Sequence, residues 1–184
     1  LRALLESARL TDTSLDAYHI GFVLAPRLNA AGRMGHAEQA VELLTTTDAT
    51  RAREIATDLT NRNAERQRVE RDITDEACQN VFDQGLNGED HRGIVLASEN
   101  WHGGVIGIVA SRLVDQFARP TVLIAVNGDG LGQGSGRSIP GFHMAEALAA
   151  CSRHLISYGG HAMAGGLKVQ PENIPAFAEA FGDY

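Results

Sequence analysis

Residues 93–126 read GIVLASENWHGGVIGIVASRLVDQFARPTVLIAV, and they contain two apolar runs with a helical pattern between them. The runs at 93–98 and 120–126 are short and rich in aliphatic residues, which predicts two buried strands. Residues 103–117 place apolar side chains at helical spacing. A strand, a helix and a second strand in this order predict an α/β domain with a partly parallel sheet.

The same alternation continues towards the end of the chain. The stretch GQGSGRSIPGF at 132–142 is a third strand or a loop, and a helical pattern follows at 142–151. A further strand is expected at 165–170, and a helix with proline in its first turn at 171–181. The predicted fold class is therefore α/β, with a small domain built on a mixed sheet.

The first half of the chain has helical patterns only. Residues 1–47 predict short helices, and residues 48–86 predict one long helix whose middle, TNRNAERQR, is polar on every side. A helix of this kind is typical of a connector between domains, so we expect its middle to contact neither of them. The α/β domain would then occupy 87–184. Because the sequence begins in helical periodicity without methionine, we expect it to be a piece of a longer protein.

Composition restricts the function. The net charge of −7 over 184 residues argues against a general nucleic-acid coat, so a bound phosphate chain would need basic groups gathered in one groove. All basic residues except Lys168 are arginines, whose guanidinium groups can make bidentate contacts to phosphate. No apolar run reaches the length of a membrane span, and two cysteines favour the reducing cytoplasm.

Polar residues stand among glycines at three places in the α/β half. Trp101 and His102 precede a helix that opens with glycines. The helix dipole and the free N–H groups at such a place favour an anion. Alternatively, the tryptophan is packed and only begins the helix. Ser135 and Arg137 flank Gly136 in a stretch that either admits a ligand to the backbone or is a flexible loop.

The third place is YGGHAMAGG, in which His161 follows Gly159 and Gly160. A lone histidine is usually structural, but the glycines would let a ligand approach. The seven histidines (19, 36, 91, 102, 143, 154, 161) show no spacing typical of metal ligands, so no metal site is predicted. No dinucleotide or P-loop motif is present.

The helical half contains LAPRLNAAGRMG at 24–35, which gathers Arg27, Asn29 and Arg33 among small residues. These side chains could bind phosphate, or they could form a buried arginine network that ties helices together.

Four stretches together carry a resemblance. LAPRLNAAGRMG, WHGGVIGIVASRL, GSGRSIPGFHMAEAL and YGGHAMAGG, in this order, resemble the RecJ group of single-stranded-DNA exonucleases within the DHH phosphoesterase family. The resemblance covers nearly the whole chain. It implies that 1–47 are the C-terminal part of a DHH domain, 48–86 the connector helix and 87–184 the DHH-associated substrate-binding domain.

The resemblance also implies an activity. The full-length protein would be a hydrolase that degrades single-stranded DNA from a 5′ end by two-metal hydrolysis with Mn²⁺ or Mg²⁺, in DNA repair and recombination. Its protein partners would include single-strand-binding protein and a helicase. No membrane contact is expected. Because no D-H-H motif occurs here, the chain by itself is expected to hold no metal and to be inactive.

The resemblance also assigns the binding residues. Ser135, Gly136 and Arg137 would grip a phosphate, with the glycines letting the strand lie against the backbone. The other implied nucleic-acid contacts are Trp101, His102, Gly159, Gly160 and His161 in the α/β domain, and Arg27, Asn29 and Arg33 from the DHH side.

Three alternatives stay open at this point. The parent protein could be another DHH phosphoesterase, such as an oligoribonuclease or a cyclic-dinucleotide phosphodiesterase. It could be a non-catalytic single-strand-binding relative. Arg137 could also be structural, pairing with Asp129 or Glu146 to hold the sheet.

Overall fold

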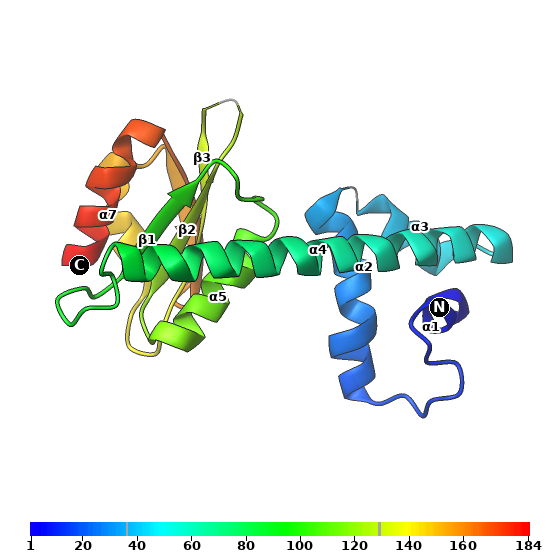
Figure 1. Cartoon of the computed structure of the whole chain (residues 1–184). Coiled ribbons are helices and arrows are strands. Elements are labelled where there is room, and N and C mark those ends of the chain that lie inside the picture. Colours follow the sequence, from blue (N-terminus) through cyan, green and yellow to red (C-terminus); the bar gives the residue numbers. More distant parts are fainter. Residues whose placement is uncertain (36, 129) are drawn as a thin grey trace. The chain divides into compact units, whose positions relative to one another are not determined.

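The computed structural model describes residues 1–35, 37–128 and 130–184. The chain forms two compact units, 1–69 and 70–184, and helix α4 (Ala49–Asp83) contributes residues to both (Figure 1). No helix in the described ranges combines the length and the apolar character needed to cross a membrane.

The second unit is built on a five-stranded sheet of order β1-β2-β3-β5-β4. The strands are β1 (Ile94–Ser98), β2 (Thr121–Val126), β3 (Gly132–Arg137), β4 (Ser157–Gly160) and β5 (Ala164–Val169). Strands β1 and β2 are parallel, and α5 (Ile106–Phe117) connects them, whereas the three other pairings of this sheet are antiparallel. The predicted strand–helix–strand unit and the mixed sheet are confirmed.

Strand β3 shows how the two faces of the sheet differ, because successive side chains of a strand point to opposite sides. Ser135 and Arg137 lie against Gly107 of α5, whereas Gly136 lies against Met144 of α6 (Met144–Ala150). Helix α7 (Ile174–Asp183) packs with α6 on one core, which includes Ile124, Met144, Leu167, Phe177 and Phe181. Helix α5 therefore covers part of one face of the sheet, and α6 and α7 cover the other.

The first unit is helical. It contains α1 (Arg2–Ser7), a π-helix (His19–Leu24), α2 (Ala25–Met34), α3 (Glu38–Thr45) and the start of α4. Its core is apolar and includes Leu4, Leu24, Leu43, Ile55 and Leu59. Apolar residues at helical spacing thus meet in one cluster, as the sequence pattern predicts.

Helix α4 is continuous through the polar stretch at 60–68, but the prediction that this stretch contacts neither domain is wrong. The Thr60 and Ser7 hydroxyls are 3.1 Å apart and share a hydrogen bond, and Asn63 is only 5% exposed. Just beyond, buried Glu70 forms an ion pair with Arg112 of α5. Polar side chains of a helix can be buried where other residues supply hydrogen-bond partners. The periodicity of a single helix does not reveal such partners.

Strand β4 (Ser157–Gly160) was not predicted from the sequence, and short 3₁₀ turns at Ser152–His154 and Pro171–Asn173 also lie outside the predicted elements. Glycine disfavours strands, so SYGG carries little strand signal of its own. Pairing with β5 orders it at the edge of the sheet.

Candidate nucleic-acid interface

Ser135 and Arg137 form the polar centre of the face that α5 covers in part. The Arg137 Nη1 donates to Ser135 Oγ at 3.0 Å and to the Gly136 carbonyl at 2.7 Å, and both side chains are partly exposed. Glu146 belongs to α6 on the opposite face of the sheet, so it does not lie beside this pair. Asp129, the other acidic partner considered above, lies outside the described residues.

Gly107 leaves the space in which this pair lies. A Cβ atom at position 107 would be 2.8 Å from Ser135 Oγ and 2.9 Å from Arg137 Nη2. Gly107 is in the first turn of α5, and the N-terminal end of a helix favours an anion. The hydroxyl and the guanidinium therefore lie beside a helix terminus that would reinforce their attraction for a phosphate.

The alternate glycines of β3 are needed for packing, because their Cβ positions are on the core face of the sheet. A Cβ at Gly134 would lie 2.7 Å from Leu167 Cγ, and a Cβ at Gly136 would lie 2.7 Å from Met144 Sδ. These glycines make room for core side chains on the far face. Gly136 reaches the interface only through its carbonyl, which holds Arg137.

Two other glycines lie on the open part of the same face. Ser135 pairs with Gly166 of β5, and Gly166 pairs with Gly159 of β4, so the three positions form one row across the sheet. A Cβ at Gly159 would meet nothing within 4 Å, and one at Gly166 would meet only the Gly134 carbonyl at 3.8 Å. Both residues are exposed, so packing does not require glycine at either position.

His161 is exposed on the turn between β4 and β5, and backbone hydrogen bonds fix this turn. The His161 N–H donates to the Ala164 carbonyl at 2.8 Å, and the Ser138 N–H donates to the Met163 carbonyl at 3.0 Å. Ala164 pairs with Arg137 in the sheet, so the turn lies at the Arg137 end of β3. Gly160 begins it with a φ of 153°, in the region that favours glycine.

Trp101 and His102 lie in the turn that leads into α5. Trp101 is 5% exposed, which matches the alternative of a packed tryptophan, and its ring is therefore not a surface contact. The His102 carbonyl accepts from the N–H groups of Val105 and Ile106 at 2.9 and 3.2 Å, and its Nδ1 accepts from the Gly104 N–H at 3.1 Å. The exposed His102 ring thus accepts a hydrogen bond within the turn that precedes α5, and it does not cap the helix.

Arg27, Asn29 and Arg33 do not form one cluster. All three lie on α2, where residues four apart share a face, so Asn29 and Arg33 are exposed together and Arg27 points elsewhere. The Arg27 Nη1 donates to the Val23 carbonyl at 2.6 Å, and burial lowers the pKa of its guanidinium. This hydrogen bond of Arg27 is therefore local, to the carbonyl four residues earlier, and it decides neither for phosphate binding nor for a network between helices.

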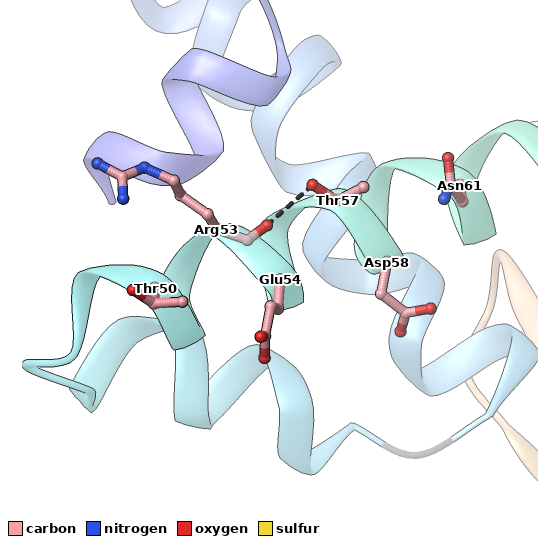
Figure 2. Close-up of a pocket in the computed structure, with 6 residues that line it drawn as sticks. All are labelled: Thr50, Arg53, Glu54, Thr57, Asp58 and Asn61. Carbon is pink, nitrogen blue, oxygen red and sulfur yellow. Dashed lines mark hydrogen bonds between the residues drawn. The ribbon is translucent and has the colours of Figure 1, made fainter.

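A separate hollow of about 560 Å³ lies along α4 in the first unit (Figure 2). It is lined by Thr50, Arg53, Glu54, Thr57, Asp58 and Asn61. Arg53 lies 3.6 Å from a carboxylate oxygen of Glu6, and Asp58 pairs with Arg62 at 2.8 Å. Since two carboxylates line it, this hollow does not suit a phosphate.

Within residues 1–35, 37–128 and 130–184, no group of three His, Cys, Asp or Glu side chains could hold a metal ion. The described residues therefore do not fit a two-metal centre, and we assign no metal-dependent step to them.

Comparison with known proteins identifies the group to which this fold belongs. The DHHA1 domain profile matches residues 69–184. The single-stranded-DNA-specific exonuclease RecJ of Bacillus subtilis is 45% identical over 157 residues, which cover 85% of this chain and 20% of that protein. The protein of the same name from Haemophilus influenzae is 40% identical over 186 residues, covering 97% of this chain and 32% of that protein.

Solved structures agree with the sequence comparison. The crystal structure of Thermus thermophilus RecJ in complex with Mn²⁺ matches with a TM-score of 0.87 and 34% identity, covering 100% of this chain and 26% of that one. The same enzyme in complex with Mg²⁺ gives a TM-score of 0.85. The chain spans between 20% and 33% of the length of the curated relatives it matches. It therefore belongs to the DHHA1 domain family, and it is similar to RecJ exonucleases over almost all of its length.

Proposed function

We propose that this chain is the substrate-binding part of a RecJ-like exonuclease that degrades single-stranded DNA from its 5′ end. The observation that carries the proposal is the Ser135–Arg137 pair, held against Gly107 at the start of α5 and beside the exposed row of Gly166 and Gly159. A guanidinium and a hydroxyl can bond phosphate oxygens, and exposed glycines let the sugar–phosphate chain lie on the backbone.

Charge supports the same assignment. The chain carries a net charge of −7, yet the positions that face this side of β3, β5 and β4 include no carboxylate. Those positions are 133, 135, 137, 157, 159, 164, 166 and 168. An acidic protein needs such a local surface to hold a polyanion.

The finer part of the proposal concerns the whole enzyme. Two-metal phosphodiester hydrolysis in DNA repair and recombination requires metal ligands that the described residues do not supply. The role proposed here for this chain is to bind and orient the strand. We propose that single-strand-binding protein and a helicase deliver that strand to the full-length enzyme.

Substrate preference tests the proposal directly. The full-length protein with Mn²⁺ or Mg²⁺ should degrade 5′-labelled single-stranded DNA faster than duplex DNA and faster than dinucleotides. Preferred turnover of dinucleotides would instead support an oligoribonuclease or a cyclic-dinucleotide phosphodiesterase. Tight single-strand binding without metal-dependent cleavage would support a non-catalytic relative.

Replacing Gly107 with alanine should weaken DNA binding without unfolding the protein. The new Cβ would displace Ser135 Oγ and the Arg137 guanidinium, whereas alanine itself suits a helix. Because the displaced atoms are the ends of side chains, the fold can adapt. We expect single-strand affinity to fall about three- to tenfold, since charged hydrogen bonds are weakened but not removed. Fluorescence anisotropy and thermal unfolding measure the two effects.

Gly182→Ala on α7 is the matched control, because a Cβ there would meet nothing within 4 Å. It should leave affinity unchanged. If Gly107→Ala folded normally and bound DNA as tightly as the parent protein, Gly107 would have no part in positioning the pair.

A further inference from the structure

A second polar row crosses the open face of the sheet beside the Ser135 row. Gln133 of β3 pairs with Lys168 of β5, and Lys168 pairs with Ser157 of β4. Cross-strand partners point to the same side of a sheet. Gln133 faces the same side as Ser135, because the two are two residues apart on β3, and a Cβ at Gly103, in the turn before α5, would lie 3.3 Å from its Oε1. The amide, the ammonium group and the hydroxyl of this row therefore share the face that carries Ser135.

The row lines a hollow of about 250 Å³ that contains no carboxylate among its described lining residues. Those residues are Gln133, Gly134, Ser157, Tyr158, Gly166, Leu167 and Lys168. Lys168 is exposed, and no ion pair of its side chain is found within the described part of the chain. The three side chains of the row can all donate hydrogen bonds, which suits an anionic ligand.

Lys168 does not have the usual structural role of a lysine in a sheet. Such lysines often protect an exposed edge strand from pairing with another chain. Lys168 lies on β5, however, which is paired with β3 on one side and with β4 on the other. Edge protection therefore does not account for it.

The spacing of the two rows fits a polymer. Ser135 and Gln133 are two residues apart on one strand, which is about 6.8 Å at the usual rise of an antiparallel strand. This is close to the length of one extended nucleotide. The flat Gly166 position lies between Ser135 and Lys168, where a ribose could pass without meeting a side chain.

We propose that Lys168, Gln133 and Ser157 form a second phosphate subsite for single-stranded nucleic acid, one nucleotide away from the Ser135–Arg137 site. The inference rests on the proposed function. It adds a distinct position that recognises the chain beyond its first phosphate, so the subsite should matter for oligonucleotides and not for a mononucleotide.

Binding of oligothymidylate to the full-length protein in EDTA tests the subsite. Lys168→Ala should weaken binding about three- to tenfold and reduce the magnitude of the slope of log K against log salt by about 0.7, the value for one phosphate contact on a single strand. Lys168→Arg should restore the slope. In competition assays with 5′-thymidine monophosphate, Lys168→Ala should have no effect, whereas Arg137→Ala should weaken binding of both ligands.

Arg92→Ala is the matched control. Arg92 is an exposed cation beside α7, in a hollow that also contains Asp90, Glu179 and Asp183, so its loss should leave affinity and slope unchanged. An equal effect of Arg92→Ala would show a general charge effect and overturn the subsite. Unchanged binding in Lys168→Ala would also overturn it, and the proposed function would stand as long as Arg137→Ala weakens binding. If neither variant weakened binding, both proposals would fail.

Discussion

Arg137→Ala should lower kcat/KM of the full-length enzyme on single-stranded DNA by about tenfold to a hundredfold, because a hydrogen bond to a charged group contributes about 1.5–3 kcal/mol. The guanidinium lies over Ser135 and the Gly136 carbonyl and is partly exposed, so its removal should leave the sheet intact. The salt dependence of binding should also weaken by about one phosphate contact, near 0.7 in slope. Single-turnover kinetics and salt titrations provide these values.

The conservative variant distinguishes geometry from charge. Arg137→Lys should recover part of the loss, because an ammonium group cannot reproduce the two parallel bonds of a guanidinium fork. The structural alternative gives the opposite pattern. A lower melting temperature with unchanged affinity, salt slope and turnover in Arg137→Ala would show that Arg137 serves the fold alone.

Gly160→Ala should destabilise the protein strongly, whereas Gly159→Ala should not. A Cβ at Gly160 would lie 2.4 Å from the Ala164 carbonyl oxygen and 2.6 Å from Gly165 Cα, at a φ of 153°. Since these are backbone atoms, β4 and β5 would have to move apart. We expect the free energy of unfolding to fall by about 2–4 kcal/mol, from backbone strain together with overpacking. Urea denaturation followed by circular dichroism measures it.

The neighbouring glycine separates folding from binding. Gly159→Ala meets open space, so its free energy of unfolding should stay within about 0.5 kcal/mol of the parent value. Its DNA affinity should nevertheless fall, because the methyl group would occupy the surface on which the strand is proposed to lie. Wild-type stability in Gly160→Ala would contradict the geometry of the turn, and wild-type affinity in Gly159→Ala would contradict the proposed path of the strand.

The parts of the fold that could be predicted from the sequence are those with a strong local pattern. The runs that became β1 and β2 are apolar throughout, and α5 between them has clear helical spacing. Strand β4 depends on its partner β5, and its glycines gave no signal of that pairing. The polar middle of α4 suggested exposure to solvent, because burial of Asn63 depends on neighbours that are distant in sequence.

The sequence indicates parts of the candidate site only where polar residues stand among glycines. Ser135, Arg137 and His161 were proposed as binding residues in this way. Lys168, Gln133 and Ser157 of the proposed subsite gave no signal in the sequence, because they come from three strands and share a row only through the register of the sheet. Trp101 gave a misleading signal, because its ring is buried. A tryptophan next to glycines has the same sequence pattern whether its ring is buried or exposed.

Photo-crosslinking tests most directly whether this face of the sheet binds the strand. Oligothymidylate containing 4-thiothymidine should be bound to the full-length protein in EDTA and irradiated, and the crosslinked peptides should be identified by mass spectrometry. Crosslinks within 132–137 and 157–168 are predicted, on the positions that face α5. Crosslinks confined to the α7 side, at 86–95 and 178–183, would contradict the proposal.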